Sequence, residues 1–290
     1  MHYRTRQVVA LAAALLLGLA GCGGDDDTSD AGADRAPVIL ATTTSTQDSG
    51  LLDTLIPAFQ KASGYQVKTV AVGSGQAIEM GTRGEADVLL VHSPAAEEEM
   101  VAAGKGRDRR TVMHNDFVIV GPASDPAKIK GASAVQAMTR IARARAPFIS
   151  RGDDSGTNTF ELKVWEKAGV QPRGSWYQES GQGMAATLQI ANDKDAYTIS
   201  DRGTFLATTN ARDLKILVEG SAELLNVYHV IEIPPENGAR VNADGGEAFA
   251  DWIVSPAAQG MIRTFGEEKF GEPLFAPDAG KTDEEIAEAA

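Results

Sequence analysis

The sequence predicts a two-lobed α/β protein, and three observations support that prediction. The chain has 290 residues, which at about 150 residues per domain is enough for two lobes. Residues 37–104 alternate short apolar runs with segments of helical periodicity, a pattern typical of an open, mostly parallel sheet. Gly121 and Pro122 follow an apolar run at residues 117–120, and such pairs commonly mark the end of a structural unit.

The first lobe begins with three strand–helix units. Its expected strands are short apolar runs of the kind buried in parallel sheets, at residues 38–41, 66–72 and 86–91. A helix is expected from residue 51 to Gly64, and another from residue 77 to Gly84. Residues 94–104 form a third helix, and we expect Glu97, Glu98 and Glu99 to be its solvated face.

The second lobe repeats the alternation after residue 121. Its expected helices and strands are residues 134–144, 148–149, 155–168, 183–191, 196–199 and 214–218. A long apolar alternation at residues 226–233 is followed by helices at residues 247–254 and 257–266. The acidic, alanine-rich tail at residues 281–290 is expected to be a frayed terminal helix.

The N-terminus predicts an export signal and a tether. Arg4 and Arg6 precede an apolar run at residues 8–20 that is too short for an ordinary membrane span, so residues 1–21 are predicted to be a signal peptide. The run ends in Leu-Ala-Gly-Cys22, which resembles the lipobox of bacterial lipoproteins and predicts lipidation of Cys22; the alternative is an uncleaved anchor helix with an incidental cysteine. Residues 22–35 contain no large apolar side chain and predict a flexible tether rather than a calcium loop.

Composition excludes several classes of function. The net charge of −13 argues against a nucleic-acid partner, because phosphates require a basic surface. A single cysteine cannot form an internal disulfide or a thiolate zinc cluster. The sequence also lacks the glycine-rich lysine loop of common ATPases. Any anion bound by this chain must therefore be held by local donors.

Three turns rich in hydroxyl groups and glycine follow expected strands, at residues 42–46, 73–75 and 150–157. In open α/β sheets, ligands bind beyond the carboxyl ends of the strands, where helix N-termini present free N–H groups. Each Ser or Thr could simply cap a helix. However, five consecutive hydroxyls at residues 42–46 exceed what one cap requires, and these turns predict an anion site.

Arg151 stands between an expected strand and an expected helix cap, where its guanidinium could bind an oxyanion. An equally good interpretation of the spacing is a salt bridge to Asp153 or Asp154. The Arg151-Gly152-Asp153 triplet also matches an adhesion motif, which predicts an exposed loop tip.

Residues 38–275 resemble the substrate-binding proteins of bacterial tungstate ABC importers, relatives of the molybdate and phosphate binders. The motifs that carry the resemblance are Ala41-Thr-Thr-Thr-Ser-Thr46, Val72-Gly-Ser-Gly-Gln-Ala77, Gly84-Glu-Ala-Asp-Val88, Ser150-Arg-Gly-Asp-Asp-Ser-Gly-Thr157 and Tyr197-Thr-Ile-Ser-Asp-Arg-Gly-Thr204. The threonine run and the Arg-Gly-Asp-x-Ser-Gly-Thr stretch are the more specific of these. The resemblance implies a periplasmic-binding-protein fold of two α/β lobes, with crossings near Val120 and Asn226 and a ligand cleft between the lobes. Lobe 1 then comprises residues 36–120 and 227–290, and lobe 2 comprises residues 121–226.

The resemblance further implies a non-enzymatic binder of tungstate with no cofactor and no bound metal cation. Its partners would be an ABC permease and its ATPase, and its location would be the periplasm or cell surface, with the lipid on Cys22 as the only membrane attachment and the chain a monomer. The ligand-binding residues so implied are Thr43, Thr44, Ser45, Ser74, Arg151, Ser155, Gly156, Thr157, Gly183 and Met184.

The chemistry of these residues is consistent with a fully deprotonated dianion. Every oxygen of tungstate accepts hydrogen bonds, so a site made only of donors suits it, whereas hydrogen phosphate keeps a proton that such a site cannot accept. We therefore expect Asp153, Asp154 and Asp201 to face backbone or solvent.

The alternatives are a binder of molybdate, phosphate or sulphate, or a secreted serine hydrolase. A hydrolase would use Ser74 or Ser155, but no Gly-x-Ser-x-Gly motif occurs. His92, His114 and His229 lie in no recognisable catalytic motif and are expected to be structural.

Overall fold

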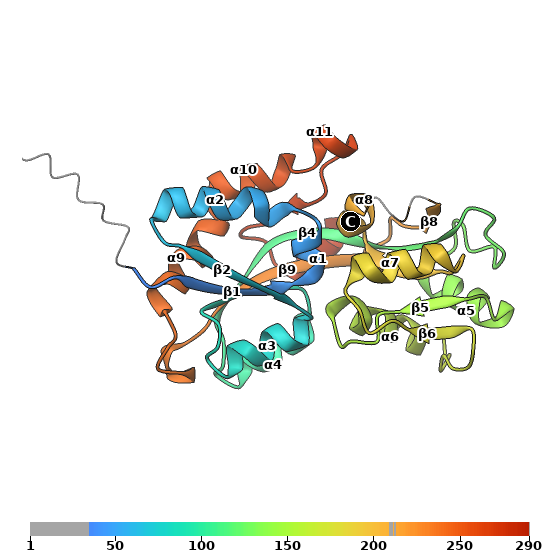
Figure 1. Cartoon of the computed structure of the whole chain (residues 1–290), viewed down its shortest axis with the longest axis horizontal. Helices are drawn as coiled ribbons and strands as arrows, with labels where there is room; N and C mark the ends of the chain where they lie inside the picture. Colours follow the sequence, from blue (N-terminus) through green and yellow to red (C-terminus); the bar gives the residue numbers. More distant parts are fainter. Residues whose placement is uncertain (1–34, 209–210, 212, 290) are drawn as a thin grey trace, which may run out of the picture.

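Two α/β lobes are built on the long strand β4 (Arg107–Pro122), which runs through the centre of the molecule (Figure 1). The computed structural model describes residues 35–208, 211 and 213–289. The predicted signal peptide, Cys22 and the tether up to residue 34 lie outside the described residues. Among the described residues, no helix has the length and apolar character needed to cross a membrane.

The sheet of the first lobe has a parallel half and an antiparallel half. Its strands follow the order β10 (Ala276–Pro277), β4, β9 (Leu225–Glu232), β3 (Val88–Val91), β1 (Val38–Thr43) and β2 (Val67–Val72). β1 pairs in parallel with both β2 and β3, as the three strand–helix units predicted. β9 returns antiparallel between β3 and β4.

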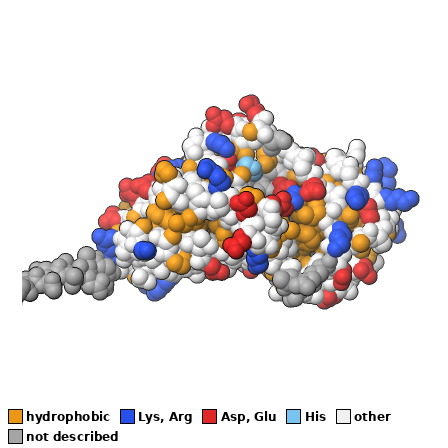
Figure 2. All heavy atoms as spheres, turned by 90° about the horizontal axis from the view of Figure 1, so that it is seen from above, with side chains coloured by type: hydrophobic (Ala, Val, Ile, Leu, Met, Phe, Trp, Pro, Cys, Tyr) orange, Lys and Arg blue, Asp and Glu red, His pale blue; other side chains and the backbone are white. Residues whose placement is uncertain are grey.

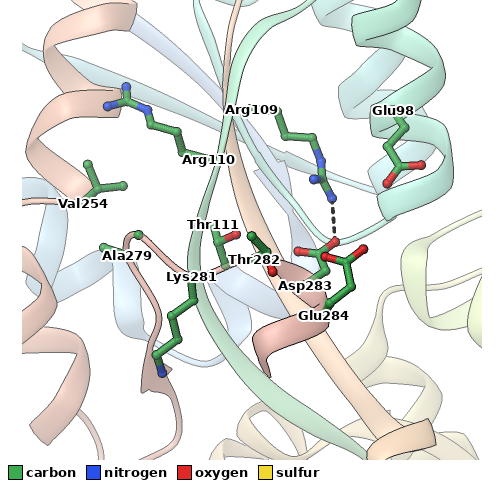
Figure 3. Close-up of a pocket in the computed structure, with 11 residues that line it drawn as sticks. Glu98, Arg109, Arg110, Thr111, Val254, Ala279, Lys281, Thr282, Asp283 and Glu284 are labelled. Atoms are coloured by element: carbon green, nitrogen blue, oxygen red, sulfur yellow. Dashed lines mark hydrogen bonds and ion pairs between the residues drawn. The ribbon is translucent and has the colours of Figure 1, made fainter. Parts of the chain in front are cut away.

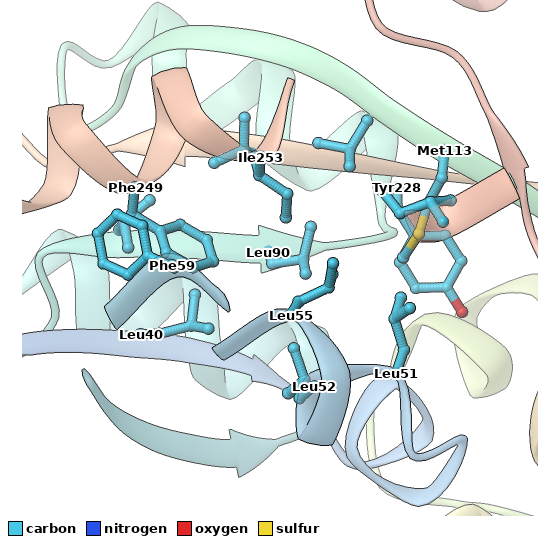
Figure 4. Packing of buried hydrophobic residues seen from close by; sticks show 14 of the residues in the cluster. Leu40, Leu51, Leu52, Leu55, Phe59, Leu90, Met113, Tyr228, Phe249 and Ile253 are labelled. Carbon is cyan, nitrogen blue, oxygen red and sulfur yellow. The ribbon is translucent and has the colours of Figure 1, made fainter. Parts of the chain in front are cut away.

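Helices cover both faces of this sheet, which explains why the central strands β1 and β3 are mostly apolar and buried. One face carries α2 (Leu51–Ser63), α9 (Ala243–Ile253) and α10 (Pro256–Thr264), and the other carries α3 (Ser74–Thr82) and α4 (Pro94–Ala102) (Figure 1). Leu40, Leu55, Phe59, Leu90 and Phe249 pack together on the first face (Figure 4).

The second lobe is built on the far half of β4. Strands β7 (Thr198–Asp201) and β8 (Leu214–Val218) pair antiparallel with it, and β5 (Phe148–Ser150) pairs in parallel with β6 (Tyr177–Glu179). Its helices are α5 (Ala134–Ala144), α6 (Gly156–Lys167), α7 (Met184–Asp193) and α8 (Arg202–Ala207). The remaining helical segments are α1 (Thr44–Asp48), α11 (Glu267–Phe270), α12 (Asp283–Ala289) and the 3-10 turns Ala222–Leu224 and Pro235–Asn237.

The chain passes between the lobes along two adjacent strands. β4 pairs with β9 as far as Asp116 and with β7 from Phe117 onward. β9 begins at Leu225, opposite Asp116. The sequence indicated only residues 117–120 of β4 as a strand, because residues 107–116 carry three arginines and two aspartates and lack an apolar run.

Two expectations about charged segments were wrong. Glu97 is completely buried rather than solvated: its carboxylate accepts hydrogen bonds from the Ser93 amide (2.6 Å) and from Nε of Arg109 (2.9 Å). The terminal helix α12 does not fray, because Ile286 is buried and Asp283 pairs with Arg109 (Figure 3). Both errors have the same cause: β4 brings arginines to carboxylates that are distant in sequence.

The start of the described chain is also held in place. Arg35, the last residue of the predicted tether, donates a hydrogen bond from Nη1 to the Ser63 carbonyl (2.9 Å) and lies over the Tyr65 ring. Charges of both signs are interspersed on the face shown in Figure 2, so on that face the net negative charge is not gathered into one field.

Candidate functional site

The N-termini of α1, α3, α6 and α7 meet where the two lobes touch. A Cβ added to Gly73, at the start of α3, would lie 3.5 Å from the Ser155 Cα at the start of α6. A Cβ added to Gly183, at the start of α7, would lie 3.6 Å from the Thr44 Oγ1 of α1. Turns that follow strands of different lobes are therefore in direct contact, and we call their polar groups the donor cradle: Thr44, Ser45, Ser74, Arg151, Ser155, Thr157 and the first N–H groups of the four helices.

The threonine run divides into structural and available hydroxyls. Thr42 donates its hydroxyl to the Leu90 carbonyl (2.7 Å). Thr43 caps α1 by accepting from the Thr46 amide (3.2 Å), and its hydroxyl lies 2.7 Å from that of Thr46 and 3.0 Å from that of Ser45. These bonds fix the turn, while Thr44 faces the second lobe.

Two hydroxyls of the donor cradle have no partner. The hydroxyls of Ser74 in α3 and Thr157 in α6 are buried and make no hydrogen bond within the described part of the chain. Leaving such a group unpaired costs about 1–3 kcal/mol. Ser155 caps α6 by accepting from the Asn158 amide (3.2 Å), which leaves its own proton free to donate. Unpaired buried donors at the contact between two lobes are typical of a ligand site.

Arg151 brings the positive charge of the site. It is 2% exposed, and Asp153 binds it through both Nε (3.1 Å) and Nη2. Nη2 also reaches the Thr44 hydroxyl of the first lobe (3.3 Å). The salt bridge to Asp153 that the spacing allowed is thus present, and burial of Arg151 excludes the exposed loop tip that an adhesion motif needs.

The three aspartates expected to face backbone or solvent differ from one another. Asp154 is exposed, as expected. Asp201 caps α8 through the Thr204 amide (2.8 Å), as expected, although it is fully buried. Asp153 accepts from the Ser155 amide (3.2 Å), but its other oxygen faces Arg151, as the alternative salt bridge allowed, and not backbone or solvent. Within the described part of the chain, none of these three aspartates makes a hydrogen bond to the hydroxyl of Ser74 or of Thr157.

His92 lies beneath the cradle at the end of β3. Its Nε2 is 3.3 Å from the Ser45 hydroxyl, and its Nδ1 has no partner within the described residues. Burial lowers the pKa of His92 to about 3, and Arg151 acts in the same direction. The imidazole is therefore neutral near pH 7. A Cβ on Gly156 would come within 2.7 Å of this ring, so only glycine fits at the start of α6.

The remaining predicted residues complete the convergence. Gly183 precedes α7 without a side-chain cap, and Met184, its first residue, is buried. Asp48 of α1 lies near the same helix start; burial raises its pKa, while the Ala185 amide and Arg151 act against that shift. Every side chain predicted to bind the ligand, apart from Thr44, is at most 3% exposed. The described arrangement is thus a closed one, in which water competes little with polar contacts.

A pocket beside α12 does not provide an anion site. About 690 Å³ of space lies beside α12, lined by Arg109, Arg110 and Lys281 (Figure 3). All three cations are already paired with carboxylates: Arg109 with Asp283, Arg110 with Glu232, and Lys281 with Asp278. Among the described residues, the donor cradle, with its unpartnered hydroxyls, remains the candidate anion site.

The fold and the cradle define a class: two α/β lobes, joined by crossing strands, that close over a site of hydrogen-bond donors. Residues 28–257 match the PBP superfamily domain, and the chain belongs to that superfamily. Within it, the chain belongs to the family of the TupA tungstate-binding proteins, because it is 47% identical to the tungstate-binding protein TupA of Peptoclostridium acidaminophilum over 96% of this chain and 99% of that protein.

Two solved structures are similar to this chain in both sequence and fold. The tungstate ABC transporter structure from Geobacter sulfurreducens is 44% identical, covers 79% of this chain and 98% of its own, and has a TM-score of 0.72. The tungstate-binding protein TupA from Desulfovibrio alaskensis G20 is 43% identical, covers 84% of this chain and all of its own, and has a TM-score of 0.69.

Sequence reasoning named Asp153 and His92 but did not place them beside the cradle. Asp153 was considered only as a competitor for Arg151, whereas it holds both Nε and Nη2 of that side chain and so orients it. His92 follows a buried strand just as the threonine run does, and that shared position was the available signal. A single histidine after a strand is common, so the signal was weak.

Proposed function

We propose that this chain is an extracytoplasmic lipoprotein that captures tungstate between its lobes and delivers it to an ABC permease driven by a separate ATPase. The observation that carries the proposal is the pair of buried, unpaired hydroxyls on Ser74 and Thr157 next to the buried Arg151. The printed names of the relatives support tungstate as the ligand.

The ligand would be held by donors from both lobes. The ten predicted residues are retained for this role: Thr43, Thr44 and Ser45 of the first turn, Ser74 of α3, Arg151, Ser155, Gly156 and Thr157 of the second lobe, and the amides of Gly183 and Met184. A doubly charged anion gains from helix N-termini and from a guanidinium in a site that excludes water. Because Asp153 accepts hydrogen bonds from Arg151 and from the Ser155 amide, its carboxylate is not free to accept the proton of a protonated oxyanion.

Attachment through lipid on Cys22, after removal of residues 1–21, belongs to the same proposal. The chain would act as a monomer without a cofactor. Mass spectrometry of the mature protein from the membrane fraction tests the anchor: an acylated N-terminal cysteine is expected, and an unmodified Cys22 or a retained residue 1 would contradict it.

Calorimetric titration with tungstate, molybdate, sulphate and phosphate tests the ligand. We expect tight 1:1 binding of tungstate, with phosphate bound far more weakly because a site made mainly of donors suits an ion that carries no proton. Tungstate and molybdate share charge and shape, so molybdate is the nearest alternative ligand. Absence of heat with tungstate, or preference for phosphate or sulphate, would overturn the proposal.

The enzyme alternative has one observation in its favour, the approach of Ser45 to His92. However, a histidine whose pKa lies about 3 cannot act as a general base at neutral pH, and no carboxylate orients its Nδ1 among the described residues. Ser74 has no histidine partner, and Ser155 caps a helix. An ester panel is expected to give no turnover; turnover abolished by Ser74→Ala would contradict the binding-protein proposal.

A further inference from the structure

The segment Asp201–Thr204, which the ligand site leaves unused, links the crossing strands to the ligand turn. Asp201 accepts from Nδ2 of Asn115 (3.2 Å), and Arg202 binds Asp116 with Nε and Nη2 (both 2.7 Å). Asn115 and Asp116 are the last two residues of β4 that pair with β9. The start of α8 is therefore fastened to the point where the chain passes from one lobe to the other.

The link continues into the second crossing strand. Nδ2 of Asn226 in β9 donates to Oδ1 of Asn115 (2.8 Å) and to the Tyr228 hydroxyl (3.0 Å). Asn115, Asn226 and Asp201 are all at most 6% exposed. Buried side-chain networks of this kind define one arrangement of the elements they join, because any other arrangement leaves polar groups unpaired.

At its other end, α8 touches the donor cradle. The Thr204 hydroxyl, fully buried, donates to the Ser45 carbonyl of α1 across the lobe boundary (3.1 Å). Its amide is held by Asp201, so the orientation of Thr204 depends on the same carboxylate that binds the crossing strand. Ser45 is a predicted ligand residue, whereas Thr204 belongs to the opposite lobe and is not one.

We propose that Thr204 is a closure-determining residue: its hydroxyl bonds the ligand turn in the closed arrangement, and so sets affinity without touching the ligand. The inference rests on the proposed function for its ligand, but the contact itself joins the lobes whatever the ligand is. A bond made only when the lobes are closed shifts the open–closed equilibrium by its own net free energy.

The test compares Thr204→Val with Thr204→Ser and with Thr208→Val. Valine keeps the shape and removes the donor, and serine keeps the donor. Thr208 is the matched control, because its hydroxyl bonds the Thr204 carbonyl within the same segment (2.7 Å) and reaches no other lobe. Thr204→Ala is a second variant in case valine impairs folding.

Tungstate titration and small-angle X-ray scattering of the ligand-free proteins give the two readouts. Thr204→Val is expected to bind tungstate about 3- to 10-fold more weakly, the loss of one neutral hydrogen bond, and to have a larger radius of gyration than wild type. Thr204→Ser and Thr208→Val are expected to match wild type in both.

An unchanged radius of gyration in Thr204→Val and Thr204→Ala would overturn the closure role, whatever happens to affinity. If wild type binds no oxyanion and Thr204→Val still expands, the proposed function fails and the closure role stands. If affinity falls equally in Thr208→Val, the effect is not specific to the contact between lobes and the inference fails.

Discussion

Two buried polar regions of this molecule differ in whether their polar groups have partners. In the donor cradle, the hydroxyls of Ser74 and Thr157 are buried without partners. In the ion cluster under α12, formed by Glu97, Arg109, His229 and Asp283, each charged group has at least one partner of opposite charge. The contrast distinguishes the proposed ligand site from a region that holds the fold.

The ion cluster shows what complete pairing requires. His229 is buried between two carboxylates, with Nδ1 2.8 Å from Glu97 and Nε2 2.8 Å from Asp283. Burial alone would lower the pKa of His229, but its hydrogen bonds to Asp283 and Glu97 raise it. The hydrogen bond from His229 lowers the pKa of Asp283 to about 2. In the donor cradle, the hydroxyls of Ser74 and Thr157 have no such partners within the described residues.

The largest expected effect is on stability, in the ion cluster. Glu97→Ala removes a completely buried carboxylate and leaves Arg109 and His229 without it, which is expected to lower the free energy of unfolding by about 3–5 kcal/mol. Denaturant unfolding measures the loss, and tungstate affinity of the folded fraction is expected to stay within about twofold. Lost affinity at unchanged stability would remove the distinction between the two regions.

The next effect is on binding, in the cradle. Arg151→Ala is expected to weaken tungstate binding by about 1.5–3 kcal/mol, the value of a hydrogen bond to a charged group, with the fold intact. The matched control is Arg110→Ala, whose side chain pairs with Glu232 and Asp251 away from the cradle. Calorimetry should show a loss for Arg151→Ala alone; equal affinities in the two variants would refute the assignment.

Ser74→Ala is expected to have a smaller effect, which weakens tungstate binding but stabilises the ligand-free protein. Removing one donor should weaken tungstate binding by about 1 kcal/mol, while removing an unpaired buried hydroxyl should raise the melting temperature of the ligand-free protein. Ser133→Ala provides the control, because that hydroxyl caps α5 and its loss should lower stability by about 1 kcal/mol without altering affinity. A lower ligand-free melting temperature in Ser74→Ala would show that its hydroxyl is structural.

The smallest effect is a pH dependence confined to the ion cluster. Because the pKa of His229 is raised by folding, its contribution is complete below its ordinary value of 6.5 and is lost as pH rises through the raised value. Because the pKa of Asp283 is lowered from 3.8 to about 2, its contribution is present above 3.8 and is lost as pH falls toward about 2.

Comparison of wild type with Asp283→Asn measures this dependence. The stability difference is expected to be about 0.5–1 kcal/mol near pH 5–6, since Asp283 is partly exposed, and to shrink on both sides. A difference that is constant across pH 3–9 would contradict the linkage.

Prediction from sequence succeeded where local pattern and tertiary environment agree. Strands β1 and β3 are mostly apolar and buried between helices, so their composition reports their position directly. The sequence did not predict the first half of β4 as a strand. Its arginines pair with carboxylates of α4, α9 and α12, and these carboxylates lie too far away in the sequence for a local pattern to include them. The same pairing buried Glu97 and anchored α12.

For the site, the sequence singled out turns that the structure brings together, but it did not indicate the use of each hydroxyl. In the threonine run, Thr42, Thr43 and Thr46 are engaged within the first lobe, whereas Thr44 reaches Arg151. Adjacent hydroxyls have the same chemistry, and only the direction of each side chain in the folded turn separates them.

The sequence by itself determined the class of chain and the kind of chemistry: alternating strands and helices, hydroxyl- and glycine-rich turns at strand ends, and one arginine among them. Those properties are local, since they depend on residue type and short-range spacing. The tertiary structure alone decided which groups pair: Arg151 with Asp153 and Thr44, Thr204 with Ser45, and Glu97 with Arg109 and His229. Burial makes an unpaired polar group costly, and which groups are buried together depends on contacts between residues far apart in the chain.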